Sequence, residues 1–298
     1  MQNADTSDHI PAPVSGNFQT PPVALTIAGS DNSAGAGIQA DLKTFTHFGV
    51  YGLTAVTCVV AEVPGKVTAI QPIEPRILED QVRLSLDAFP VAAIKTGMLF
   101  SVEIIEAILR ILDQRGASIP LVVDPVMVAT SGSKLLQDNA IAAYEEKLIP
   151  RATLVTPNLD EAAVLLGEAI RSLDDMERAG RKLAEKFRTS FLMKGGHLPG
   201  GVAVDLLVES GGLVTRLEGP FVSGVDTHGS GCTYSSAITA NLAHGYSLRE
   251  AVSLSKSFMN QAIQRSFSWQ HPHSGKVMAL NHFQHEAAPS ASHAEPPA

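Results

Sequence analysis

The chain contains few cysteines and no concentration of basic residues. Cys58 and Cys232 are its two cysteines in 298 residues. Two thiols cannot build a disulfide framework, and such scarcity is typical of a protein kept in a reducing cytoplasm. The 22 lysine and arginine residues form no cluster and stand against 30 acidic residues, which gives a net charge of −8. Without a basic patch, we do not expect nucleic acid as a partner.

Long apolar runs are also missing from the sequence. No stretch approaches the roughly 18 consecutive apolar residues that a membrane-spanning helix needs. Residues 1–22 are polar and contain proline, with neither a basic segment nor an apolar core, so no signal peptide is recognisable. We therefore predict a cytoplasmic protein without a membrane partner.

The length and composition favour one folded domain with two loose ends. Apolar residues make up 45% of the chain and charged residues 17%, which is ordinary for a globular protein with a sizeable core. We predict a disordered leader over residues 1–22, a folded domain over 23–268 and a disordered tail over 269–298. The tail has no apolar period, and its histidines lack metal-site spacing, so we expect them to be solvated.

Between the two ends, short apolar runs alternate with segments of helical period. Ile38, Leu42 and Phe45, for example, recur at the spacing of one helix face. Such alternation predicts a mainly parallel sheet with helices on both faces, and the pattern around Gly211 and Gly212 adds an antiparallel edge hairpin. Strands are predicted at Val23–Ala28, Thr54–Val60, Val91–Lys95, Leu121–Asp124, Thr153–Thr156, Ser190–Lys194, Val202–Val208 and Leu213–Leu217.

A small-residue turn precedes a helical segment near the carboxyl end. Gly229, Ser230 and Gly231 allow the backbone to turn tightly and to direct several N–H groups at one point, next to the positive end of the following helix. Cys232, a residue that exchanges a proton, ends the turn. An anion site beside a proton-handling side chain suits phosphoryl transfer. A plain glycine-rich helix start with a buried cysteine is the alternative.

Polar residues follow several of the predicted strands. Asp124, Asn158 and Lys194 each come at or just after a strand end, where ligands bind in open α/β sheets. Asp124 and Glu161, with the amide oxygen of Asn158, offer hard oxygen ligands of the kind that suit Mg²⁺. Asn158 and Glu161 also have the spacing of a helix capping box, and the two roles are compatible. Lys194 would neutralise phosphate charge, unless it is only a partly exposed strand-end lysine.

The order of these motifs resembles the hydroxymethylpyrimidine/phosphomethylpyrimidine kinases of thiamine biosynthesis. The resemblance covers roughly residues 23–268 and implies a ribokinase-like three-layer sandwich. It also implies an enzyme that uses ATP and Mg²⁺ to phosphorylate a pyrimidine alcohol and then its monophosphate, and a homodimer. The motifs that carry it are AGSDNSAGAGIQADLKT at 28–44, VDPVM at 123–127, TPNLDEA at 156–162, MKGGH at 193–197 and GSGC at 229–232.

The resemblance assigns roles on the phosphate side. Cys232 would take the proton of the acceptor hydroxyl, where the wider superfamily has aspartate, and we expect the helix start and Lys194 to lower the pKa of its thiol. The glycine turn would hold the transferred group, with Thr227 and Ser230 adding hydroxyl contacts. Asp124 and Glu161 would hold the ion mostly through water.

The resemblance also assigns an acceptor pocket to Gly29, Asp41, Met98 and Val126. Asp41 would accept hydrogen bonds from the substrate, and Met98 would contact the ring, although a core methionine is the commoner case. The stretch from Val126 to residue 135 could close as a lid. Cys58, among apolar neighbours, is interpreted as inert core.

One position departs from the family pattern. Where the family commonly has Val-Ala-Gln, this chain has Val60-Ala61-Glu62. An ionised Glu62 can only accept hydrogen bonds, so its contact with the ring and the substrate preference are open, and a solvent-facing Glu62 is the alternative.

Two other functions stay open from the sequence. Pyridoxal or pyridoxine kinase uses a similar acceptor, although the second cysteine of some such enzymes is absent from the predicted lid. A ligand-binding protein that does not catalyse is the other, and it is disfavoured because Asp124, Glu161, Lys194 and Cys232 are all present.

Overall fold

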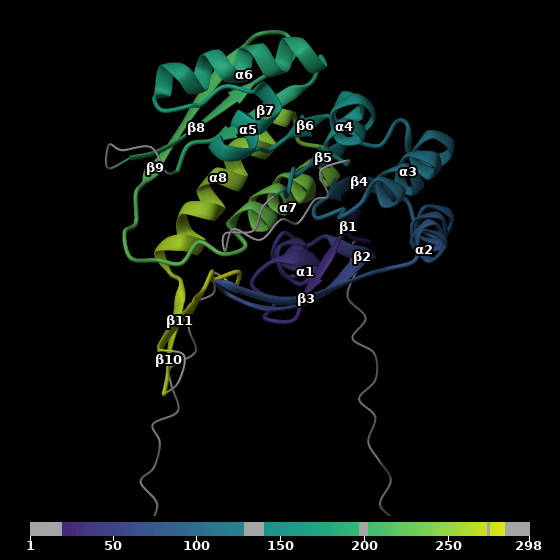
Figure 1. The fold of residues 1–298 in the computed structure, drawn as a ribbon, viewed down its shortest axis with the longest axis horizontal. Coiled ribbons are helices and arrows are strands. Elements are labelled where there is room, and N and C mark those ends of the chain that lie inside the picture. Colours follow the sequence, from purple (N-terminus) through teal and green to yellow (C-terminus); the bar gives the residue numbers. More distant parts are fainter. Residues whose placement is uncertain (1–19, 128–139, 197–201, 273–274, 284–298) are drawn as a thin grey trace, which may run out of the picture.

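The protein is built around a nine-stranded sheet with the strand order β3-β2-β1-β4-β5-β6-β7-β8-β9 (Figure 1). The computed structural model describes residues 20–127, 140–196, 202–272 and 275–283. Strands β1 to β9 are Val23–Asp31, Tyr51–Val63, Lys66–Pro72, Val91–Thr96, Leu121–Val123, Leu154–Val155, Ser190–Lys194, Val202–Val208 and Val214–Pro220.

Six neighbouring strands of the sheet, in the order β2, β1, β4, β5, β6 and β7, run parallel to one another, as the apolar runs predicted. The predicted antiparallel edge is formed by β8 and β9 beyond β7. The sequence analysis missed β3, which adds a second antiparallel edge beside β2. None of the side chains of strand β3 is buried, so it lacks the apolar run that marked the central strands.

Helices cover both faces of the sheet and complete the predicted three-layer sandwich. One apolar core lies on the side of α1 (Gly37–His47), α7 (Ser230–Ala243) and α8 (Leu248–Gln264). A second core lies on the opposite side. Its helices are α2 (Pro75–Ala88), α3 (Val102–Ile111), α4 (Ala140–Ala143), α5 (Leu159–Leu166) and α6 (Leu173–Phe187), with short irregular helical turns at Leu112–Gly116, Tyr144–Leu148 and Ile149–Arg151. Among the described residues, no helix is long and apolar enough to cross a membrane.

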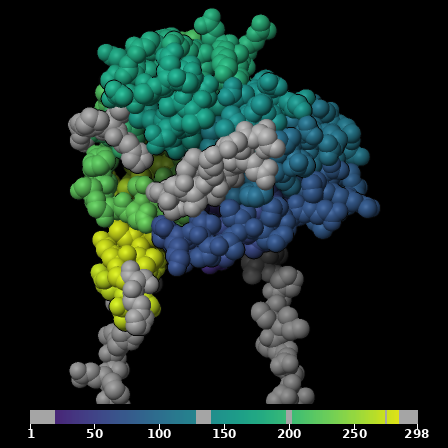
Figure 2. Space-filling model, viewed as in Figure 1, coloured from purple at the N-terminus to yellow at the C-terminus, as the bar shows by residue number. Residues whose placement is uncertain are grey.

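The prediction of a disordered tail is wrong for the part of the tail that the structure describes. Strands β10 (Phe267–His271) and β11 (Gly275–Ala279) form an antiparallel hairpin, which projects from the body of the molecule (Figure 2). The chain then returns to the body, where His282 is 3% exposed and its ring nitrogen Nε2 lies 2.9 Å from Thr233 Oγ1. No side chain of its two strands is buried, so the hairpin lacks the buried apolar run that marked the central strands.

Candidate active site

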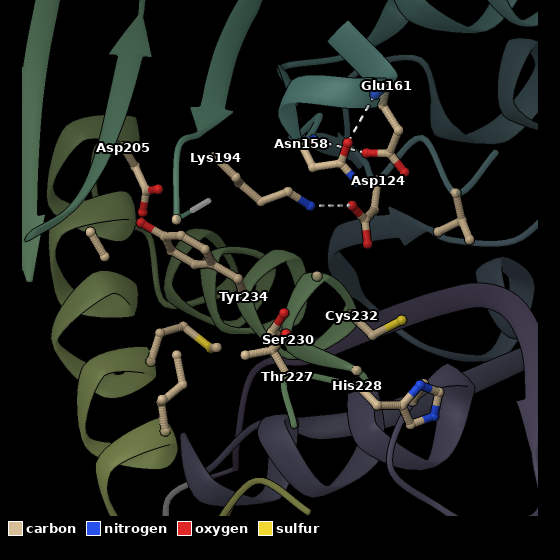
Figure 3. Close-up of a pocket in the computed structure, with 18 of the residues that line it drawn as sticks. Asp124, Asn158, Glu161, Lys194, Asp205, Thr227, His228, Ser230, Cys232 and Tyr234 are labelled. Carbon is tan, nitrogen blue, oxygen red and sulfur yellow. Dashed lines mark hydrogen bonds and ion pairs between the residues drawn. The ribbon is translucent and has the colours of Figure 1, made fainter. Parts of the chain in front are cut away.

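A cavity of about 330 Å³ lies at the carboxyl ends of the parallel strands (Figure 3). The sheet brings together residues that are far apart in sequence because parallel strands end at the same edge. Almost every residue that the sequence analysis assigned to a site lines this cavity, and Asp41 is the exception. The assigned residues that line it are Gly29, Glu62, Met98, Asp124, Val126, Asn158, Glu161, Lys194, Thr227, Gly229, Ser230, Gly231 and Cys232.

The glycines of the turn at the start of α7 are needed for close approaches. Gly229 has a left-handed backbone with φ of 78°, and a Cβ there would lie 1.8 Å from the carbonyl oxygen of Gly35. A Cβ on Gly231 would lie 3.2 Å from Lys194 Nζ and 3.4 Å from Asp124 Oδ2. The missing side chain therefore leaves space for a ligand beside both charged groups.

Lys194 and Asp124 form an ion pair on the cavity wall. Lys194 Nζ lies 3.1 Å from Asp124 Oδ1, and the two side chains are 16% and 3% exposed. Asp124 also accepts hydrogen bonds from Thr156 Oγ1 at 3.0 Å and Ser235 Oγ at 3.3 Å. Burial alone would lower the pKa of Lys194, but the charges of Asp124 and Glu161 outweigh it and raise that pKa. The ammonium is therefore charged and faces the cavity.

Asn158 and Glu161 form the capping box at the start of α5. Asn158 Oδ1 accepts from the Glu161 backbone N–H at 2.8 Å, and Glu161 Oε2 accepts from the Asn158 N–H at 2.9 Å. Burial raises the pKa of Glu161 to about 7, with Lys194 opposing and Asp124 adding to the rise. A buried carboxylate next to another carboxylate is stabilised by a cation, so this oxygen donor set fits Mg²⁺. In the part of the chain that the structure describes, no cluster of three metal-ligating His, Cys, Asp or Glu side chains occurs, so phosphate and water would complete the shell.

Cys232 lies in the first turn of α7, and its electrostatic surroundings contradict one expectation. Burial raises the pKa of its thiol to about 12, and the carboxylates of Asp41 and Asp124 add to the rise while Lys95 opposes it. We expected a lowered pKa. The charge of Lys95 and a backbone hydrogen bond from Gly37 are outweighed by burial and by the two carboxylates. Neither the burial nor the nearness of Asp41 is visible in the sequence.

Small and apolar groups form the acceptor end of the cavity. A Cβ on Gly29 would lie 2.9 Å from Cys58 Sγ, so the backbone of Gly29 packs too closely on Cys58 to carry a side chain. Cys58 is fully buried, as expected of inert core, and packs with Met98 and Val126. Glu62 is half-buried in the lining, which favours a pocket contact over the solvent-facing alternative. Its pKa is raised by burial and by the charge of Asp31.

Asp41 does not line the cavity, which differs from its expected contact with the substrate. It is completely buried below the cavity and accepts from Lys95 Nζ, Thr26 Oγ1 and Ser236 Oγ, each at 2.6 Å. Lys95 is also 0% exposed. The sequence analysis missed this pair because Lys95 stands within a strand whose apolar residues marked it only as core.

Other cavity residues were missed as well. His228 belongs to the glycine-turn motif but had been given no role. Lys256, on α8, pairs with Asp205 on β8 at 2.7 Å, and Figure 3 shows the Tyr234 hydroxyl pointing toward Asp205. Their spacing in the sequence is too long for local reasoning to connect them. The predicted lid lies outside the described residues from residue 128 onward.

The fold and the cavity define a kinase with the ribokinase-like sandwich. A glycine turn at a helix start, a charged lysine and paired carboxylates converge in it, as phosphoryl transfer from a nucleotide requires. Residues 31–277 match the model of the phosphomethylpyrimidine kinase family, and the chain belongs to this family.

Known relatives support both the family and the fold. The chain is 38% identical over 243 residues to the hydroxymethylpyrimidine/phosphomethylpyrimidine kinase of Bacillus subtilis, covering 82% of this chain and 89% of that protein. The crystal structure of phosphomethylpyrimidine kinase from Clostridium difficile has a TM-score of 0.72 and 41% identity, covering 81% and 99% of the two chains. Pyridoxal kinase from Staphylococcus aureus in complex with AMP-PCP and pyridoxal has a TM-score of 0.78 and 35% identity, covering 89% and 94%.

Proposed function

We propose that the protein transfers the γ-phosphoryl group of ATP to the hydroxymethyl group of 4-amino-5-hydroxymethyl-2-methylpyrimidine. It then phosphorylates the resulting monophosphate to the diphosphate. The observation that carries the proposal is the position of the glycine turn. The glycine turn Gly229–Gly231 lies beside Lys194 and Asp124 and shares the lining of one cavity with the small and apolar residues Gly29 and Met98.

The charged wall is assigned to the nucleotide phosphates. Lys194 neutralises the charge of the phosphoryl group in transfer, and the turn donates backbone N–H groups to it. Thr227 and Asn158 add polar contacts to the nucleotide. Asp124 and Glu161 would hold Mg²⁺, which would offset the charge of the nucleotide phosphates.

The transfer step moves one phosphoryl group and one proton. The acceptor oxygen forms a bond to the γ-phosphorus while the bond from that phosphorus to the β,γ-bridging oxygen breaks, and ADP leaves with the electron pair. We assign the hydroxyl proton to the thiolate of Cys232. The thiolate is the minor form at neutral pH, since the pKa is about 12, so the rate should rise with pH. A loose transition state demands little of such a base.

The apolar wall is assigned to the pyrimidine ring, and a relative supports a second acceptor. Gly29, Met98 and Val126 offer flat apolar contacts, and Glu62 can accept from the 4-amino group. Pyridoxal also presents a hydroxymethyl group on a flat nitrogen-containing ring, and a pyridoxal kinase shares 35% identity with this chain. The pyrimidine is preferred because the family model that matches is that of the phosphomethylpyrimidine kinases.

Product analysis by mass spectrometry tests the proposal. The protein is incubated with ATP, Mg²⁺ and either the pyrimidine alcohol or pyridoxal. We expect pyrimidine monophosphate first, then diphosphate, with one ADP formed for each phosphoryl group transferred. Phosphorylation of pyridoxal alone would assign the second function, and no ADP with either acceptor would point to a ligand-binding protein.

Assembly and location follow from the same resemblance. We infer a homodimer, which light scattering coupled to size-exclusion chromatography would measure. We also infer a cytoplasmic location, supported by two free cysteines and the absence of a disulfide framework.

A further inference from the structure

Three charged side chains, His228, Asp31 and Glu62, form a cluster at the acceptor end, and the roles assigned above include neither His228 nor Asp31. His228 Nε2 lies 3.2 Å from Asp31 Oδ2, and their side chains are 16% and 1% exposed. Glu62 lies close enough for its charge to act on both. His228 and Glu62 line the cavity. Figure 3 shows the His228 ring on the same side of the cavity as Cys232, away from Asp205 and Tyr234.

The His228 ring is held in place by the loop that follows β1. Asp31 accepts hydrogen bonds from the backbone N–H groups of Ser33 and Ala36, both at 2.7 Å, which fixes the carboxylate. The ring packs on Gly35, where a Cβ would lie 2.9 Å from His228 Cδ2. Gly35 and Gly229 therefore allow the loop after β1 and the turn before α7 to pack closely together, and this packing places the His228 ring at the cavity wall.

This arrangement favours a positively charged imidazole ring. The hydrogen bond to Asp31 raises the pKa of His228, burial opposes the rise, and the charges of Asp31, Glu62 and Asp226 add to it. The pKa of Asp31 is lowered to about 2: burial raises it, but the hydrogen bonds from His228, Ser33 and Ala36 outweigh that effect. The remaining charged group of this region is Lys43 on α1, whose charge also acts on Asp31. An imidazolium bound to Asp31 through Nε2 keeps a second N–H donor.

The acceptors of the two proposed steps, the pyrimidine alcohol and its monophosphate, differ in charge. The pyrimidine alcohol is uncharged at its hydroxyl, whereas its monophosphate carries close to two negative charges at neutral pH. Among the described residues in the cavity lining, Lys194, Lys256 and His228 can carry positive charge. Lys194 is paired with Asp124 at the transfer point and Lys256 with Asp205 at the opposite end. His228 is the cation on the side where the acceptor would bind.

We propose that His228 binds the phosphate group of the monophosphorylated acceptor, so that it serves the second phosphorylation and not the first. This inference rests on the proposed function. The imidazolium donates an N–H to a phosphate oxygen and offsets the repulsion between the acceptor and donor phosphates.

Three variants test the role of His228 in kinetics with each acceptor and ATP. His228→Gln keeps a donor for Asp31 but removes the charge, and His228→Lys restores a charge. His244→Gln is the matched control, because the exposed His244 contacts the Phe48 carbonyl oxygen at 2.8 Å and lies outside the cavity lining. We expect His228→Gln to lower kcat/KM for the monophosphate by about 10- to 100-fold, the value of a charged hydrogen bond. For the alcohol it should change by less than about threefold. His228→Lys should recover most of the loss.

The pH profile distinguishes a charge from a packing role. The ratio of kcat/KM for monophosphate to that for alcohol should fall as pH rises through the raised pKa of His228. A thiol base affects both reactions and cancels in the ratio. The acceptor phosphate itself titrates near pH 6 in every variant. The ratio for His228→Gln should lack the fall, so its difference from the wild-type ratio gives the contribution of the His228 ring. Glu62→Gln should move the fall to lower pH, because it removes a carboxylate that raises the pKa of His228.

The outcomes separate this inference from the proposed function. Equal losses with both acceptors in His228→Gln, or no loss with the monophosphate, would overturn the role of His228. If His228→Gln does not fold, the wild-type ratio and its shift in Glu62→Gln still decide the question. A wild-type protein that phosphorylates the alcohol but forms no diphosphate would overturn this inference and the second step of the proposed function, and it would leave the first step standing. One that phosphorylates neither acceptor would overturn both.

Discussion

Two lysine–aspartate pairs with the same chemistry have different surroundings. Lys95 near the end of β4 pairs with Asp41 at 2.6 Å, and both side chains are 0% exposed. Lys194 at the end of β7 pairs with Asp124 at 3.1 Å, and the lysine side chain is 16% exposed. The first pair is closed off below the cavity and the second is open to it.

The difference separates a structural ion pair from a functional one. Asp41 receives two further hydroxyl hydrogen bonds, from Thr26 and Ser236, so its buried carboxylate accepts three hydrogen bonds within the protein. Lys194 instead faces the gap left by Gly231, where an anion can replace part of its contact with Asp124. Cys232 lies between the pairs, since charges from both affect its thiol.

The largest effect on stability is expected at the closed pair. Lys95→Met leaves Asp41 buried without its cation and should lower the free energy of unfolding by about 3–5 kcal/mol, measured by urea denaturation. The double variant Lys95→Met with Asp41→Leu should recover much of this loss, because two apolar groups replace two charges. A single variant as stable as the wild type would show that the pair is not structural.

Cys232, between the two pairs, should affect rate rather than stability. We expect Cys232→Ala to lower kcat by on the order of 10²–10⁴, because a proton acceptor is lost while the backbone turn remains. Nucleotide affinity, measured by calorimetry, should stay within about threefold, since the turn binds through its backbone. Near-normal turnover would mean that the turn and Lys194 suffice for transfer.

Substitution of the lysine in the open pair should affect the rate more than the stability, which is the reverse of the closed pair. Lys194→Met should lower kcat by about 10²–10³, the usual result of removing one preorganised electrostatic group. Its unfolding free energy should fall less than that of Lys95→Met, because water in the cavity can solvate Asp124. Lys147→Met, which removes an exposed ion pair with Glu106, is the control and should leave kcat unchanged. A larger stability loss than for Lys95→Met would break the comparison.

The smallest effect is expected on Mg²⁺ dependence. Glu161→Gln keeps the capping box but loses a carboxylate of the open site, so the Mg²⁺ concentration for half-maximal rate should rise by about tenfold. Glu250→Gln is a matched control, since Glu250 occupies the same position in the capping box of α8. An equal Mg²⁺ dependence in both variants would contradict the assignment of Glu161 to the ion.

The sequence predicted the parallel sheet and most of the cavity lining because these depend on local patterns. Apolar runs marked the central strands, and a polar residue after a strand end must lie at the ligand-binding edge. The expected contact of Asp41 with the substrate is not formed, because Asp41 on α1 points below the cavity and pairs with Lys95, which lies 54 positions away in the sequence. The hairpin β10–β11 was missed because no side chain of its two strands is buried, so it lacks the apolar run of a central strand.

The sequence alone determined the family, the order of the central strands, and the chemical groups available for phosphoryl transfer. It could do so because backbone preferences and motif spacing are local properties of the chain. Only the tertiary structure decided which lysine is closed off and which is open, that the Cys232 thiol is protonated, and that His228 is held by Asp31. These depend on burial and on charges brought together from distant segments, and both arise only when the sheet and its helices have packed.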